Sequence, residues 1–246
     1  RDRLRSRGLG DVYKRQPTNF DPSKRYPVVM SQYSGPGSQS VLDKWTIDWE
    51  YYLVSKGFIV ACVDGRGTGG RSRAYETSVY MQLGKLETED QVAGAEYMRT
   101  LPYVDDKHIG IYGWSYGGYE TLMAMSTSNG TYQAGVAIAP VTDWRYYDTI
   151  YAERFMRTPN ENNEGYEQSA PITHAEKLKG DLLIISGTAD DNVHYLNTLQ
   201  YSAALIEAGI QFDTQIYTNK DHHIRGCNTR HHLYSKVCNF FLDKLK

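Results

Sequence analysis

A serine between two glycines is the strongest candidate for chemistry in the chain, because the segment Gly113–Gly117 has the sequence GWSYG. A strand-like apolar run, residues 109–112, precedes it, and a helix-like run, residues 119–125, follows. A serine on such a strand-to-helix turn forms a nucleophile elbow, and glycines are needed because side chains there would collide with neighbouring elements. N–H groups at the helix start would face the negative charge that develops during acyl transfer. The five-residue pattern alone also arises by chance, so the prediction of a nucleophile at Ser115 depends on the flanking strand and helix.

A serine nucleophile needs a base, and suitable partners follow later strand-like runs. One such run leads into Asp190, and the next leads into His222 and His223. Serine, aspartate and histidine in this chain order, each just after a strand, are typical of α/β-hydrolase triads. Ser115 would attack a carbonyl carbon, a histidine would take and return its proton, and the aspartate would orient the imidazole. Spacing does not decide between the two histidines, and Asp190 by itself could cap the following helix.

The elements that must position these residues alternate between strands and helices. Continuous apolar strand runs, each followed by a helix, predict a mostly parallel sheet that is covered on both faces and doubly wound. The predicted fold class is therefore α/β, with an α/β-hydrolase fold. We expect strands at residues 26–30, 58–63, 109–112, 134–138, 182–186 and 212–217, and helices at residues 41–56, 86–101, 118–126, 193–208 and 228–244. The largest interruption, residues 141–178, is predicted to be an irregular insertion that shapes a substrate pocket.

Composition narrows the classes of function. The 246 residues carry a formal net charge of −2 without long charged runs, which argues against nucleic acid and anionic membranes as partners. No apolar run approaches the ~20 residues that a membrane-spanning helix needs, so no span is predicted. No cluster of cysteine and histidine has zinc-site spacing, and the sequence predicts neither a metal nor a cofactor.

Two further sequence features have structural interpretations. Cys62 lies in an apolar run and is predicted to be a buried thiol, whereas Cys227 and Cys238 could pair with each other. The glycine-rich segment Asp64–Gly69 lacks the Lys-Ser/Thr ending of a phosphate-binding loop. We therefore interpret it as a turn at a strand exit.

The first sixteen residues differ from the rest of the chain. The segment Arg1–Gln16 carries six arginine or lysine residues and little apolar periodicity, and from Leu4 onward it resembles a translated sequencing-adaptor read-through. We expect residues 1–16 to be non-native and exclude them from the fold. Residues 17–246 are assigned to one catalytic domain, and the native protein is expected to begin upstream of Pro17.

Eight short segments, in order along the chain, match one enzyme family. They are Gln32–Pro36, Asp64–Gly69, Gly113–Tyr119, Ala139–Val141, Trp144–Asp148, Tyr151–Arg154, Gly187–His194 and Asp221–His222. On these segments, residues 17–246 resemble the catalytic domain of the prolyl oligopeptidase family of serine peptidases. The resemblance is strongest to its dipeptidyl peptidase IV branch, and within that branch to the bacterial enzymes.

The resemblance implies catalytic roles for particular residues. It assigns Ser115, Asp190 and His222 to a triad, and it makes the Tyr33 hydroxyl and the Tyr116 backbone N–H an oxyanion hole. A phenol suits that task because it is rigid and its hydrogen bond strengthens as the oxyanion forms. Without the resemblance, Tyr33 would be interpreted as an aromatic residue packed at the end of a strand.

The resemblance also implies a substrate-binding slot for proline. A flat, rigid aromatic slot fits a proline ring and few other side chains. Asn192 would hold a carbonyl of the substrate backbone, although an asparagine there could equally cap a helix. Without the resemblance, the aromatic residues would be interpreted as a core patch. The implied slot residues are Tyr116, Val141, Trp144, Tyr147, Tyr151 and Val193.

The implied activity is the release of N-terminal dipeptides after proline, or alanine, through an acyl-enzyme. Relatives carry an upstream β-propeller that binds the free N-terminus of the substrate, form homodimers, and in bacteria are exported to the periplasm or cell surface. One departure is His223, where many relatives have glycine. The resemblance therefore does not determine the shape of that loop. The alternatives are an acylaminoacyl peptidase or carboxylesterase of the same fold, and an inactive fragment or binding module.

Overall fold

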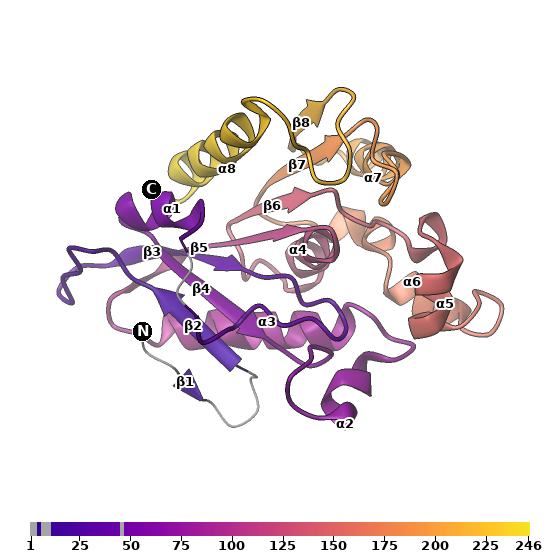
Figure 1. The fold of residues 1–246 in the computed structure, drawn as a ribbon, viewed down its shortest axis with the longest axis horizontal. Helices are drawn as coiled ribbons and strands as arrows, with labels where there is room; N and C mark the ends of the chain where they lie inside the picture. Colours follow the sequence, from indigo (N-terminus) through magenta and orange to yellow (C-terminus); the bar gives the residue numbers. More distant parts are fainter. Residues whose placement is uncertain (1–3, 6–10, 45–46) are drawn as a thin grey trace.

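A mostly parallel sheet forms the centre of the molecule in the computed structural model, which describes residues 4–5, 11–44 and 47–246 (Figure 1). The strand order in the described residues is β1-β2-β4-β3-β5-β6-β7-β8. Strands β3 to β8 pair in parallel, whereas β2 is antiparallel to both β1 and β4. The strands are β1 (Leu4–Arg5), β2 (Asp11–Arg15), β3 (Tyr26–Ser31), β4 (Ile59–Asp64), β5 (Val104–Trp114), β6 (Ala134–Ile138), β7 (Asp181–Gly187) and β8 (Asp213–Tyr217).

Helices cover both faces of the sheet, so the predicted doubly wound α/β architecture is confirmed. Figure 1 shows α1 and α8 on one side of the sheet and α3 on the other. The α-helices are α1 (Glu50–Ser55), α2 (Arg73–Glu76), α3 (Lys85–Arg99), α4 (Tyr116–Thr127), α5 (Thr149–Met156), α6 (Asn163–Gln168), α7 (Leu196–Glu207) and α8 (Thr229–Lys244). Short 3₁₀ helices are η1 (Thr77–Val79), η2 (Trp144–Tyr146) and η3 (Pro171–Lys177). None of the helices in the described ranges is long and apolar enough to cross a bilayer.

Strands β3, β4, β6 and β7 are apolar along most of their length because each contributes side chains to two cores. Val28 and Met30 of β3 join the cluster that includes side chains from α3, α4 and α7. Val29, between them, joins the cluster that includes side chains from α1 and α8. Successive side chains of a strand point to opposite faces, so a sheet covered on both faces needs apolar residues at every position.

The predicted helix over residues 41–56 is wrong for most of its length. In the described part of this segment, the helix is α1 alone, which begins at Glu50. The backbone N–H groups of Ser40 and Val41 donate to the carboxylate of Asp64 at the end of β4, over 2.9 Å and 2.7 Å. These bonds tie the start of the segment to the sheet in place of a first helical turn.

The predicted irregular insertion, residues 141–178, is largely helical. It contains η2, α5, α6 and η3. Asp143 and Asp148 accept backbone N–H groups at the starts of η2 and α5, which is the capping role that aspartate prefers. Short helices with local caps lack the long apolar periodicity that a sequence pattern can reveal.

Residues 11–15, which the sequence interpretation excluded from the fold, form strand β2. This strand pairs with β4 over its whole length, from Asp11 opposite Asp64 to Arg15 opposite Val60. Val12 and Lys14 are buried and their neighbours are half-buried, so the segment has the two-residue alternation of a strand with one buried face. A free strand edge can pair with any extended segment of this pattern.

Backbone crowding at the turn between β5 and α4 accounts for the glycines of the elbow. A Cβ atom on Gly113 would lie 2.1 Å from the carbonyl oxygen of Gly117. A Cβ atom on Gly117 would lie 2.5 Å from the carbonyl oxygen of Gln32, just beyond β3. Since both obstacles are backbone atoms, no side-chain rotation relieves them.

Replacement of Gly113 by alanine is expected to lower the free energy of unfolding by about 3 kcal/mol or more, because the backbone of the elbow must shift. The matched control is Gly57→Ala, since a Cβ atom at Gly57 meets nothing within 4 Å and only its φ of +86° is unfavourable. That control should cost about 1 kcal/mol. Urea denaturation of both variants measures the difference, and equal losses would contradict the role of crowding.

Candidate active site

Ser115 has the strained backbone that the sequence predicts for a nucleophile elbow. Its φ is 60° and its ψ is −116°, which lies outside the regions that non-glycine residues ordinarily adopt. Its N–H donates to the carbonyl of Ile138 at the end of β6 over 2.8 Å, and its carbonyl accepts from Tyr119 over 2.9 Å. These bonds fix the turn, so the serine stands between the end of β5 and the start of α4.

The structure joins Asp190 and His222, which lie 32 positions apart in the chain, by a hydrogen bond of 2.8 Å between Oδ2 and Nδ1. The other oxygen of Asp190 accepts the N–H groups of Asn192 and Val193, over 3.0 Å and 2.9 Å. Asp190 therefore caps a turn and also holds the imidazole. Both side chains of the pair are buried, whereas His223 is exposed, so His222 is the histidine that this geometry selects.

Hydrogen bonds between loops bring His222 to the elbow. The loop after β7 donates from Ala189 to the carbonyl of Lys220, in the loop after β8, over 3.0 Å. The indole N–H of Trp114, directly before Ser115, donates to the carbonyl of His222 over 3.0 Å. The ends of β5, β7 and β8 are thereby held together, at the edge of a parallel sheet where ligands bind.

Tyr33 lies next to Ser115, just beyond the end of β3. Burial raises the pKa of Tyr33, and a hydrogen bond with the Ser115 side chain partly offsets that rise. The side chain is 39% exposed, so it can also meet a bound molecule. Gln32 ties this segment to α4, because its amide donates to the carbonyl of Gly117 over 2.8 Å. Sequence reasoning missed the role of Gln32, although it lies in one of the matched motifs.

The implied slot residues form one apolar cluster beside the elbow, which also includes Tyr119 and Met156. The ring of Trp144 lies 5.5 Å from that of Tyr116 and stacks on that of Tyr151 at 5.8 Å. Trp144 and Tyr116 are buried, whereas Tyr147 and Tyr151 are half-buried and border the exposed side. Val141 and Val193 complete the cluster from the loops after β6 and β7. The arrangement offers rigid ring faces to an apolar group.

Asn192 lies at the exposed rim of this cluster. Its side-chain oxygen accepts a hydrogen bond of 2.7 Å from the hydroxyl of Tyr147. An asparagine amide also carries two N–H donors, which this contact does not use. Asn192 can therefore donate to a carbonyl of a bound chain.

The segment Asp64–Gly69 is a turn at a strand exit, as the sequence predicts. The N–H of Gly67 donates to Tyr75, and the N–H of Gly69 donates to Ser38. Since these backbone donors bond within the protein, they are not aimed outward at a phosphate. The turn instead supports the loop that follows Tyr33.

All three cysteines are unpaired in the structure. Cys62 is buried, as the sequence predicts, and burial raises the pKa of its thiol. Cys227 is exposed and Cys238 is buried, and the structure does not contain the disulfide bond between them that the sequence left as an alternative. Within residues 4–5, 11–44 and 47–246, no group of three or more histidine, cysteine, aspartate or glutamate side chains is arranged to hold a metal ion.

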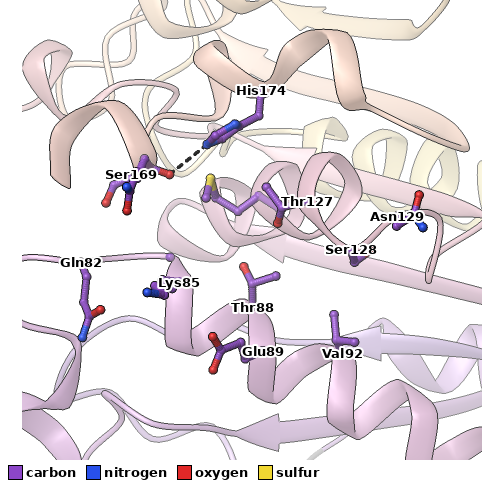
Figure 2. A pocket seen from close by; sticks show the side chains of 13 residues that line it. Gln82, Lys85, Thr88, Glu89, Val92, Thr127, Ser128, Asn129, Ser169 and His174 are labelled. Carbon is purple, nitrogen blue, oxygen red and sulfur yellow. Dashed lines mark hydrogen bonds between the residues drawn. The ribbon is translucent and has the colours of Figure 1, made fainter. Parts of the chain in front are cut away.

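A separate cavity of about 540 Å³ lies between α3, α4 and the junction of α6 and η3 (Figure 2). Its lining includes Lys85, Thr88, Ser128 and His174, and it contains neither Ser115 nor the pair Asp190 and His222. The cavity is therefore distinct from the candidate active site.

Two buried carboxyl groups lie between α3 and α4, and sequence reasoning missed both. Glu87 and Glu120 have no exposed surface. Glu87 accepts a hydrogen bond of 2.8 Å from the hydroxyl of Tyr116, and Glu120 accepts one of 2.8 Å from Thr88. Burial raises the pKa of Glu87 to about 7, although hydrogen bonds from Tyr116 and nearby backbone groups lower it. Burial likewise raises the pKa of Glu120 well above its ordinary value.

Comparisons with known proteins agree on one family. The profile described as "Prolyl oligopeptidase family" matches residues 45–246. The chain is 44% identical over 236 residues to "Probable dipeptidyl-aminopeptidase B" of Talaromyces marneffei, with 94% of the chain and 26% of that protein covered. It is 41% identical over 228 residues to "Dipeptidyl peptidase 4" of Sus scrofa, covering 91% of the chain and 30% of that protein.

A solved structure matches almost the whole chain. The crystal structure of Porphyromonas gingivalis dipeptidyl peptidase 4 superposes with a TM-score of 0.94 at 55% identity, covering 96% of the chain and 33% of that protein. The chain thus spans about a quarter to a third of the length of these relatives.

The buried Glu87 carboxyl is expected to make the stability of the folded protein depend on pH. Its pKa, raised from 4.5 to about 7, means that the folded state binds this proton more tightly than the unfolded chain. Its contribution to stability is therefore largest at low pH and falls as the pH rises through this range. Glu87→Gln removes this titration. The change that it causes in the free energy of unfolding should therefore be about 2 kcal/mol more stabilising at pH 8 than at pH 5.

The measurement is urea denaturation at both pH values. The control is Glu89→Gln, on the exposed side of the same helix, where the carboxylate pairs with Arg66. This control should not reproduce the gain in stability at pH 8 that is expected for Glu87→Gln. A Glu87→Gln effect that also does not change with pH would show that Glu87 does not titrate in this range.

Proposed function

Because the chain belongs to the prolyl oligopeptidase family, we propose that it is the catalytic domain of a serine peptidase that releases N-terminal dipeptides after proline or alanine. Membership of this family was predicted from eight short motifs. The α/β-hydrolase fold that the chain shares with its solved relative was predicted from the alternation of strands and helices. The peptidase domain begins after residue 16 in this proposal.

One observation carries the proposal more than any other. The hydrogen-bonded pair of Asp190 and His222 is tied by Trp114 to the strained turn that presents Ser115. Structural ion pairs are common, but this pair lies beside a nucleophile elbow and at the carboxyl ends of neighbouring parallel strands. That combination supports acyl transfer rather than a purely structural role.

In the proposed reaction, Ser115 Oγ attacks the carbonyl carbon of the peptide bond after the second residue. Nε2 of His222 takes the hydroxyl proton and then gives it to the leaving amine, so that an acyl-enzyme and a shortened peptide result. Asp190 accepts a hydrogen bond from the Nδ1–H of the imidazole, which selects the tautomer and stabilises the imidazolium. Water then repeats the sequence and releases the dipeptide.

The negative oxygen that forms in each step is bound by the Tyr33 hydroxyl and the backbone N–H of Tyr116. The contact between Tyr33 and the Ser115 side chain supports this role, since it brings the phenol to the reacting oxygen. A raised pKa keeps the phenol protonated and able to donate. Such a donor typically contributes roughly 3 kcal/mol of transition-state stabilisation.

The aromatic cluster binds the residue before the cleaved bond. Trp144, Tyr147 and Tyr151 offer ring faces, and Val141 and Val193 narrow the space, so a proline ring fits better than a long polar side chain. Tyr116 forms the inner wall. Asn192 donates to the carbonyl of the residue in front of the proline.

The longer protein is proposed to carry an upstream β-propeller that binds the free N-terminus and so limits release to dipeptides. It is further proposed to act as a homodimer in the periplasm or at the cell surface of a bacterium. Both proposals come from the resemblance of residues 17–246 to the dipeptidyl peptidase IV branch. The length of the relatives supports the proposed upstream domain, since the chain covers about a quarter of the fungal protein.

Ser115→Ala is expected to abolish labelling by a fluorophosphonate probe and to lower kcat on an Ala-Pro anilide by about 10⁴-fold or more, because the nucleophile is lost. The experiment uses the full-length protein. The control is Ser126→Ala, a buried serine on the same helix that bonds to Tyr201 rather than to the site. Labelling that survives in the Ser115 variant would exclude Ser115 as the nucleophile.

The wild-type protein is expected to hydrolyse Ala-Pro anilide at least about tenfold more efficiently than Ala-Lys anilide, measured as kcat/KM. The reason is that none of the proposed slot residues carries a carboxylate to pair with a buried ammonium group. An acetyl group on the N-terminus should block cleavage of Ala-Pro anilide. Equal turnover of the two anilides would refute the slot, and preference for the acetylated substrate would indicate an acylaminoacyl peptidase.

A further inference from the structure

Tyr116 belongs to the slot and also follows the reacting serine, so the position of its ring affects both the slot and the elbow. Its backbone follows Ser115 directly. Its ring is 97% buried and lies 5.1 Å from the ring of Tyr119, 5.5 Å from that of Trp144 and 6.2 Å from that of Tyr33. A small rotation of this ring would change the width of the slot and the place of the elbow beside it.

The hydroxyl of Tyr116 is anchored by Glu87 rather than by any residue of the slot. The hydrogen bond of 2.8 Å is formed between two buried groups, and Glu87 has no exposed surface. Burial raises the pKa of the Tyr116 phenol well above its ordinary value, so the phenol is the donor at neutral pH. A buried phenol without an acceptor is strongly unfavourable, so this contact favours one ring position.

Glu87 reaches Tyr116 from a different element, the first turn of α3. Leu83, two residues before that helix, contributes a second contact, since its carbonyl accepts a hydrogen bond of 2.9 Å from the hydroxyl of Tyr119. The start of α3 therefore holds both tyrosines of α4 that border Trp144. Neither Leu83 nor Glu87 belongs to the residues assigned to catalysis or to the slot.

We infer that Glu87 is a positioning residue for substrate selection: its hydrogen bond fixes the Tyr116 ring and thereby sets the width of the slot for the residue before the cleaved bond. This inference rests on the proposed function of the site. Glu87 does not touch the substrate or the reacting atoms. Its loss should therefore alter the choice between proline and alanine more than the reactivity of Ser115.

Glu120 provides a matched control. It is also a fully buried glutamate between α3 and α4, and it too accepts one hydrogen bond from a hydroxyl, that of Thr88. Thr88 is not a slot residue, and it borders the separate cavity instead (Figure 2). Any general effect of removing a buried carboxyl should therefore appear equally at both positions.

The experiment compares Glu87→Met, Glu87→Gln, Glu120→Met and Tyr116→Phe in the full-length protein, with Ala-Pro and Ala-Ala anilides. Glu87→Met, which keeps the volume but loses the acceptor, should lower kcat/KM on Ala-Pro about tenfold, mainly through KM, and on Ala-Ala about twofold. Glu87→Gln, which keeps an acceptor oxygen, should restore most of the preference for proline. Tyr116→Phe should reproduce the loss of preference, and Glu120→Met should leave the preference unchanged.

An unchanged preference in Glu87→Met or Tyr116→Phe would overturn the inference, and so would an equal loss in Glu120→Met. Crystal structures of the wild type and Glu87→Met give a readout that does not depend on activity. A displaced Tyr116 ring beside an unmoved Tyr119 supports the inference, whereas an unmoved Tyr116 ring overturns it. If the wild type cleaves neither anilide, the proposed function fails, and the crystal structures still decide whether Glu87 positions Tyr116.

Discussion

The tight turn between β5 and α4 is the constraint on which the site depends. Two backbone segments approach so closely there that neither Gly113 nor Gly117 has space for a Cβ atom. The resulting backbone at Ser115 is strained, and it persists because the ends of β6 and α4 bond to both sides of the residue. The surrounding loops are bonded to this turn and to the strand before it.

Hydrogen bonds rather than apolar packing set the relative positions of the surrounding loops. Gln32 ties the segment with Tyr33 to the carbonyl of Gly117, and Trp114 ties the loop with His222 to the strand that ends at Ser115. Directional bonds suit this purpose because they specify both distance and orientation. The two apolar cores beneath the loops provide the rigid base from which these bonds act.

The parts of the structure that depend on local pattern were predictable from the sequence. Parallel strands covered on both faces leave unbroken apolar runs, and the elbow requires its glycines. The sheet, the turn at Ser115 and the place of Asp190 after a strand could therefore be inferred. Spacing alone did not separate His222 from His223, because the difference lies in burial against Asp190. The family resemblance selected His222, and the structure pairs the same residue.

Other features depend on tertiary contacts that no local pattern encodes. A glutamate in the first turn of a helix is ordinarily a solvated residue, so nothing near Glu87 in the sequence indicates that Tyr116 covers it. The segment before α1 is held by Asp64 of β4, which lies far ahead in the chain. The helices between β6 and β7 are too short for periodicity to reveal them, and β2 forms because a strand edge was free to pair.

The proposed reacting groups lie outside the helical segment between β6 and β7. This separation has a consequence for how substrate selectivity can diversify in such a protein. The serine, aspartate and histidine all follow strands of the sheet, whereas Trp144, Tyr147 and Tyr151 belong to that segment. If the proposed roles hold, substitutions in the segment change selectivity while Ser115, Asp190 and His222 keep their positions. Tyr116 is the exception, because the proposal gives it a role in both parts. A substitution there that changed substrate preference would also disturb the proposed catalytic groups.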